Sequence, residues 1–328
     1  MGCERVDGPS AGVRDGVRAG RLRGREKRGP EGPNVDILLN GAATISAVTV
    51  LIPDSLDRAV AQLADHPEAH VIAGGTDVMV EVNFGHRRPE AVLSLGRVPE
   101  LKGWRRVDDR LVLGAGVTYT ELLDPAVAEL APALAQAART VGSPQIRNAG
   151  TVGGNLGTGS PAGDTLPVLI ALDAVLTLVS LTGTRDVALA EFCVGPKRTT
   201  LRPGELISSV TIPVAAGPQE YLKVGPRNAM VISVAGLAAV ADSGSRTVAV
   251  GLGSVGPVPL RAPEAEAFAS ERVDWRDGRL TDPADAEEFG RLTAAAARPI
   301  DDHRSTADYR RHCVGVLARR ALTRMFAA

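Results

Sequence analysis

Two glycine-rich runs about eighty residues apart carry the residue types best suited to ligand binding. The first, residues 73–77, reads AGGTD, and the second, residues 151–155, reads TVGGN. Because glycine has no Cβ, its backbone N–H can come close to a ligand, and successive exposed N–H groups form a concavity that binds anions. Two such runs predict one long anionic ligand held from both sides, for which a dinucleotide pyrophosphate is the natural candidate.

The surroundings of the second run favour a binding loop over a structural turn. The polar sequence QIRNAG at residues 145–150 leads into it, and SPAGD at residues 160–164 follows. Such polar density between two predicted helices is poor core material. The first run alone is compatible with a simple turn between a strand and a helix.

The elements around the first run predict a parallel α/β unit. Residues 48–53 form an apolar strand, and Asp54 or Ser55 then caps a helix through about Ala64. Strand 70–73 enters the glycine run, a helical turn follows at 77–82, and 91–95 is a third strand. Strand–helix–strand order of this kind builds parallel sheets.

The rest of the chain predicts a second sheet with helices, a linker at residues 213–218 and a third α+β unit from residue 219 onwards. In the second unit we expect strands 110–117, 174–180, 184–188 and 207–212 and helices 126–140 and 166–172. In the third we expect strands near 231–240 and 246–252 and helices near 263–269, 282–297 and 305–326.

Composition excludes several functional classes. The net charge of −1 gives no general attraction to nucleic acids or membranes, and no apolar stretch reaches the ~20 residues of a membrane span. Cys3, Cys193 and Cys313 are scattered, which predicts free thiols, no metal site and a cytoplasmic protein. Residues 1–45 predict a disordered tail, unless the start codon is placed too early.

A literal dinucleotide fingerprint occurs later in the chain. Gly251, Gly253 and Gly256 have the spacing GxGxxG and follow an apolar strand. Pro257 and Pro259 come next, so no helix begins there to receive a phosphate. We therefore expect a glycine-rich turn at this place.

The chain resembles the FAD-binding medium subunit of molybdenum hydroxylases, the xanthine dehydrogenase and carbon monoxide dehydrogenase family. The resemblance is carried by both glycine runs and the segment 145–164, and it extends from about residue 48 to 326. Later segments that share it are GPKRTT at 195–200, ELI at 205–207, YLK at 221–223 and DHRSTADYRR at 302–311.

The resemblance implies an α+β fold. A PCMH-type, vanillyl-alcohol-oxidase-like FAD-binding domain would span residues 46–216, with α/β subdomains at about 46–97 and 98–216. A smaller α+β domain of the carbon monoxide dehydrogenase flavoprotein type would span residues 217–328.

The resemblance also implies which residues hold FAD. Backbone N–H groups of the first run and its flanks would wrap the pyrophosphate and ribityl region: Val71, Ile72, Ala73, Gly74, Gly75, Thr76, Asp77 and Val78. The second run would hold the other side, with hydrogen bonds from the Thr151 hydroxyl and the Asn155 side chain: Thr151, Val152, Gly153, Gly154 and Asn155.

Four further positions complete the implied site. Asp164 would accept hydrogen bonds from FAD hydroxyls, and Val141 and Ile207 would make apolar or backbone contacts. Lys223 would lie at the far end of the ligand, near the pyrimidine end of the flavin, where reduced flavin carries negative charge. A fixed ammonium there would tune its potential.

The function implied is that of an electron-transfer subunit in a dimer of heterotrimers. A large partner subunit would carry the molybdenum cofactor, and a small [2Fe-2S] subunit would pass electrons to FAD and then to NAD, oxygen or a quinone. Two alternatives stay open: a self-sufficient FAD-dependent oxidase or reductase of the same fold, and a non-catalytic flavin-binding assembly protein.

Overall fold

The structure, a computed structural model, describes residues 48–326, so the tail predicted at 1–45 lies outside the described residues. The first segment holds a three-stranded parallel sheet in the order β1-β3-β2. Its elements are β1 (Thr49–Leu51), α1 (Leu56–Asp65), β2 (His70–Ile72), α2 (Val78–Asn83) and β3 (Ala91–Ser94). The predicted parallel unit is confirmed.

Helix α1 shows why this unit folds locally. The Ser55 side chain accepts from the Arg58 N–H and caps the helix. Ala59, Val60 and Leu63 then fall on one face at helical spacing and are buried.

The second segment is built on a five-stranded antiparallel sheet in the order β4-β5-β10-β6-β7. Burial largely alternates along β6 and β10, so about every second side chain of each strand points into the core. The strands are β4 (Trp104–Val107), β5 (Arg110–Gly114), β6 (Val175–Ser180), β7 (Gly183–Ala188) and β10 (Leu206–Pro213). A small hairpin, β8 (Cys193–Gly195) with β9 (Arg198–Thr199), precedes β10.

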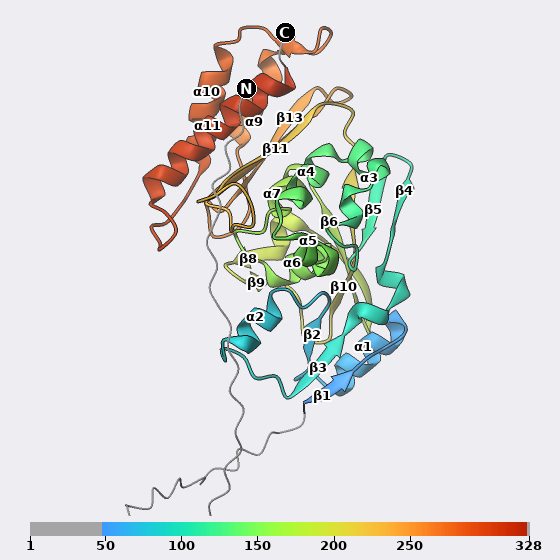
Figure 1. Cartoon of the computed structure of the whole chain (residues 1–328). Coiled ribbons are helices and arrows are strands. Elements are labelled where there is room, and N and C mark those ends of the chain that lie inside the picture. The colour runs from blue at the N-terminus through green and yellow to red at the C-terminus, as the bar shows by residue number, and fades with distance from the viewer. Residues whose placement is uncertain (1–47, 327–328) are drawn as a thin grey trace, which may run out of the picture. The chain divides into compact units, whose positions relative to one another are not determined.

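The helices of this segment lie mostly between β5 and β6 in the chain (Figure 1). They are α3 (Pro125–Leu130), α4 (Pro132–Thr140), α5 (Pro144–Ala149), α6 (Val152–Thr158), α7 (Leu166–Ala171) and, later, α8 (Leu189–Phe192), with 3₁₀ turns at Leu95–Arg97, Pro99–Leu101 and Glu121–Leu123. The prediction of one helix over 126–140 is wrong. Pro132 lacks an N–H, so α3 stops at Leu130 and Pro132 opens α4 instead.

The C-terminal unit is an antiparallel sheet, β11-β12-β13-β14, with helices α9, α10 and α11 (Figure 1). Its bounds are β11 (Gln219–Val224), β12 (Ala235–Asp242), β13 (Thr247–Gly253), β14 (Leu260–Arg261), α9 (Pro263–Arg272), β15 (Val273–Asp274), β16 (Arg279–Leu280), α10 (Asp285–Ala296) and α11 (Ala307–Met325). Helices α9 and α11 pack on the sheet, which also contacts α4 and α7 of the preceding segment. The mixed α+β class is therefore confirmed.

The GxGxxG glycines serve this packing. Gly251 and Gly253 belong to β13, so the prediction of a turn is wrong. A Cβ on Gly251 would lie 1.8 Å from the carbonyl oxygen of Pro167, and one on Gly253 would lie 2.6 Å from the Pro167 ring. Glycine is needed because the sheet touches the backbone of α7 directly.

Among residues 48–326, no helix is long and apolar enough to cross a membrane, and no group of three His, Cys, Asp or Glu side chains could hold a metal ion. Cys193 and Cys313 are buried free thiols. Cys3 lies outside the described residues.

Candidate functional site

The fold brings the two glycine runs side by side. A Cβ on Gly74 would lie 1.7 Å from the carbonyl oxygen of Ala149 and 3.1 Å from the backbone nitrogen of Gly150. A Cβ on Gly154 would lie 4.0 Å from that of Ala73. Only glycine permits the first approach, because any side chain at residue 74 would overlap a backbone carbonyl.

The first run is a backbone cradle between the end of β2 and the start of α2. Gly75 has a φ of +71°, a left-handed conformation that favours glycine. Within residues 48–326, the backbone N–H groups of Gly74, Gly75, Thr76 and Asp77 donate no hydrogen bond. Successive donors without acceptors form an anion-binding concavity, which fits a pyrophosphate.

The second run is not a loop but the N-cap and first turn of α6, so the predicted loop conformation is wrong, whereas its role in binding stays a prediction. Thr151 caps α6, with its hydroxyl oxygen accepting from the Gly154 N–H at 3.0 Å. Val152 and Gly153 donate their N–H groups to the carbonyls of Val117 and Ala115. Asn155 donates its N–H to the Thr151 carbonyl. These donors are satisfied inside the protein, so the backbone N–H groups of this run are not free to bind a ligand as those of the first run are.

The Asn155 side chain is held in a fixed orientation. Its Oδ1 accepts from the hydroxyl of the buried Thr165 at 2.7 Å, and a Cβ on Gly163 would come within 2.8 Å of its Nδ2. Sequence reasoning missed Thr165, whose only signal was its place directly after Asp164.

A buried ion pair joins the second segment to the C-terminal sheet. The Lys223 Nζ lies 2.7 Å from Asp164 Oδ2, and the side chains are 7% and 9% exposed. Lys223 also donates to the carbonyl of Thr140, and the Tyr221 hydroxyl donates to Asp164 Oδ1 at 3.0 Å. Burial raises the pKa of the Asp164 carboxyl, while Lys223 and Tyr221 oppose that rise.

The sequence predicted separate roles for Asp164 and Lys223 and did not predict that the two side chains form a pair. Tyr221 was missed as a member of the site. Its signal was the spacing of two from Lys223, which puts both side chains on one face of β11.

The two apolar candidates lie on different elements of the second segment. Val141 follows α4 directly after Thr140, and its carbonyl accepts from Arg147 at 3.0 Å. Ile207 is buried in β10, with its Cδ1 3.9 Å from where a Cβ on Gly157 of α6 would stand.

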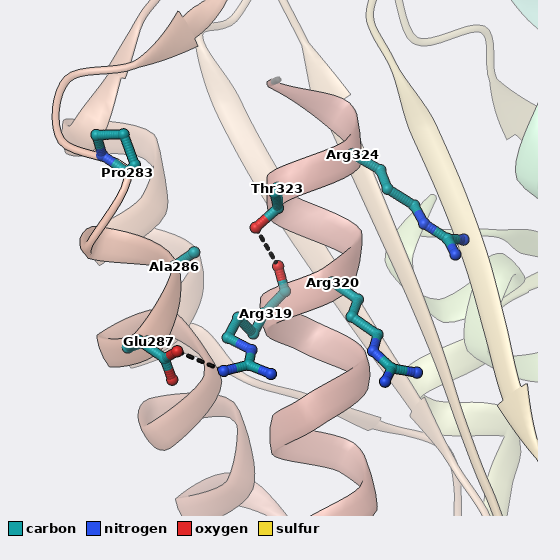
Figure 2. A pocket seen from close by; sticks show the side chains of 7 residues that line it. All are labelled: Pro283, Ala286, Glu287, Arg319, Arg320, Thr323 and Arg324. Carbon is teal, nitrogen blue, oxygen red and sulfur yellow. Dashed lines mark hydrogen bonds and ion pairs between the residues drawn. The ribbon is translucent and has the colours of Figure 1, made fainter. Parts of the chain in front are cut away.

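Two surface pockets lie in the C-terminal unit. One, of about 460 Å³, is lined by Pro283, Ala286, Glu287, Arg319, Arg320, Thr323 and Arg324. Figure 2 shows Arg319 directed at Glu287 of α10, with Arg320 and Arg324 extending from the other side of α11. The second, of about 480 Å³, is lined by Pro226, Arg227, Met230, Val231, Ile232, Val234, His303 and Arg304. Neither contains a residue of the glycine runs or of the Asp164–Lys223 pair.

Comparison with known proteins decides the family. Residues 46–215 match the model described as the FAD binding domain in molybdopterin dehydrogenase. Residues 220–325 match the CO dehydrogenase flavoprotein C-terminal domain. The chain belongs to the FAD-binding subunits of the molybdenum hydroxylase family. It is thus an oxidoreductase subunit, and its cofactor is FAD.

Relatives and solved structures of the family agree. The chain is 32% identical to the nicotine 6-hydroxylase medium subunit of Paenarthrobacter nicotinovorans, over 85% of this chain and 97% of that one. It is 37% identical to the nicotinate dehydrogenase FAD-subunit of Eubacterium barkeri, over 65% and 76%. The quinoline 2-oxidoreductase structure from Pseudomonas putida 86 has a TM-score of 0.78 at 26% identity, covering 85% of this chain and 96% of that one.

Proposed function

We propose that this chain is the electron-transfer flavin subunit of a multi-subunit molybdenum-containing dehydrogenase. It works with a large molybdenum-cofactor subunit and a small [2Fe-2S] subunit, as a dimer of heterotrimers. The bound FAD takes up electrons from the partner's clusters and gives them to an external acceptor, which is NAD, oxygen or a quinone.

The observation that carries this proposal is the first glycine run. Among residues 48–326, its N–H groups from Gly74 to Asp77 have no acceptor, so a pyrophosphate placed there meets free donors. Gly74 itself lies against Ala149, which shortly precedes the second run. Asn155, fixed by Thr165, presents its side chain at the neighbouring helix. In this arrangement Val71, Ile72 and Val78 flank the backbone cradle, and Val141 and Ile207 supply apolar or backbone contacts.

Asp164 and Lys223 act as one unit in the proposed site. The two charges lie 2.7 Å apart and largely cancel at a distance, so a potential set by Lys223 alone would be weak. The unit instead fixes the position of a carboxylate that can still accept hydrogen bonds, since a carboxylate has about four acceptor sites. Lys223 tunes the flavin only through the small residual field of the pair.

The domain organisation and location of the chain follow from the same proposal. We place the FAD-binding domain at residues 46–216, with subdomains at 46–97 and 98–216, and the C-terminal domain at 217–328. Support for the last boundary comes from a separate core of buried residues between Ala235 and Phe326. Scattered free cysteines fit the reducing conditions of the cytoplasm.

The test is the absorbance spectrum of the purified full chain and the identity of the proteins that co-purify with it. The expected result is a yellow protein with about one FAD per chain that co-purifies with a molybdenum subunit and a two-cluster subunit. A colourless protein that takes up no added FAD would overturn the proposal. A yellow protein that turns over an organic substrate without partners would favour a self-sufficient oxidase.

A further inference from the structure

A cluster of charged side chains lies at the C-terminal end of the first glycine run and includes its last residue, Asp77. Asp77 and Glu81 stand four residues apart at the start of α2, so they share one face of the helix. The Lys197 Nζ lies 2.8 Å from Glu81 Oε1 and 4.0 Å from Asp77 Oδ2. Arg87 donates to the other oxygen of Glu81 and contacts the His70 ring.

This cluster connects two parts of the chain that are distant in sequence. Asp77 and Glu81 follow the glycine run in the first segment, whereas Lys197 occupies the turn of the β8–β9 hairpin in the second, 116 residues after Glu81. Thr158, at the end of α6, adds a hydrogen bond of 3.4 Å to Asp77. The run is therefore held against the second segment by polar contacts at one end and by Gly74 at the other.

The conformation of the hairpin aims Lys197 at α2. Lys197 has a φ of +54°, which is unfavourable for a residue with a Cβ, and its N–H donates to the Gly159 carbonyl at 2.9 Å. A strained residue persists where its surroundings determine it and often marks a functional position. Here the anchor, Gly159, is the residue that ends α6.

The energetics point to a role in ligand retention. The Lys197 side chain is 53% exposed and that of Glu81 is 24% exposed, and an ion pair so open to water stabilises a fold only weakly. A ligand held between two segments leaves only when one of them moves, so a weak contact across that gap can act on release without deciding the fold.

We propose that Lys197, with Glu81 and Asp77, is an electrostatic latch that holds the first glycine run against the second segment and slows the dissociation of FAD. Lys197 is a positioning residue, since it acts through α2. The inference rests on the proposed function, because it needs FAD to lie between the two runs.

The test measures the rate at which FAD leaves the loaded, full-length protein on dilution, followed by the fluorescence of the released flavin. Lys197→Met keeps the apolar stem and removes the charge, and Glu81→Gln removes the partner. Each should raise the release rate about two- to five-fold, the range expected of an exposed pair. The double variant should be no worse than either single one.

Arg58→Met is the matched control. It breaks an ion pair with Asp54 that is also exposed but stays within the first segment, and it should leave the release rate unchanged. The excess rate of Lys197→Met should shrink between about 0.01 M and 1 M salt, as screening lengths fall from ~30 Å to ~3 Å. The free energy of unfolding of the apoprotein should change no more in Lys197→Met than in the control.

The outcomes separate the two ideas. If the wild-type protein takes up no FAD, the proposed function fails. If the wild type binds FAD and Lys197→Met releases it at the wild-type rate, the latch is refuted. Additive effects in the double variant, or a loss of apoprotein stability without faster release, would also overturn it.

Discussion

Gly74→Ala is the sharpest test of the cradle, because the added methyl has no room. The new Cβ would lie 1.7 Å from the carbonyl oxygen of Ala149 and 2.4 Å from its carbonyl carbon. Both atoms are backbone, so no side chain can rotate away. The first run and the Ala149 backbone must separate by roughly 2 Å to restore ordinary contact distances, and overpacking of this kind costs ~1–3 kcal/mol.

The separation should lower the affinity for FAD as well as the stability of the protein. A displacement of about 1 Å in a positioning element can cost on the order of 100-fold in function, so we expect FAD affinity to fall at least about ten-fold, or about 1.4 kcal/mol. Calorimetric titration of the apoprotein with FAD measures the affinity, and urea unfolding measures the stability.

Gly157→Ala provides the control. Its Cβ would meet only Ile207 Cδ1, at 3.9 Å. Since Gly157 lies inside helix α6, alanine there should be neutral or stabilising by up to ~1 kcal/mol. If Gly74→Ala binds FAD and unfolds like the wild type, the two runs do not approach as described.

Three further predictions concern titratable groups. Lys223→Met should lower the free energy of unfolding in urea by ~3–5 kcal/mol, because it leaves a buried, unpaired carboxylate. Adding Asp164→Asn should recover most of that loss. A loss under about 1 kcal/mol in the single variant would contradict the buried pair. Burial, helped by Arg87, lowers the pKa of His70, so the unfolded chain binds the proton more readily. The stability should fall as the pH drops through about 6.5, and His70→Gln should reduce that slope; an equal slope in the variant would remove His70 as its source. Burial raises the pKa of Cys193 to about 11. At pH 8 a thiol reagent should therefore label this thiol far more slowly in the native protein than in urea, which peptide mass spectrometry measures. Equal labelling rates would mean that the thiol is accessible.

Much of the fold could be predicted because it depends on neighbours in the sequence. Ser55 with Ala59, Val60 and Leu63 defines α1 through a cap and a helical period. The first glycine run correctly indicates where strand β2 ends and helix α2 follows. The helix break at Pro132 has an equally local cause, a missing N–H, although the helix predicted over residues 126–140 ran through it.

The sequence by itself determined the family, its cofactor and the two runs that approach each other. Only the tertiary structure decided which donors of those runs are free. Gly153 and Gly154 donate their N–H groups to Ala115 and Thr151, whereas those of Gly74 and Gly75 have no partner in the part of the chain that the structure describes.

The sequence likewise could not predict the pairs Asp164–Lys223 and Glu81–Lys197, because 59 and 116 residues separate their members. Composition and periodicity report what a segment does by itself. Partners brought together by long-range packing depend on how the sheets and helices meet, which no local pattern encodes.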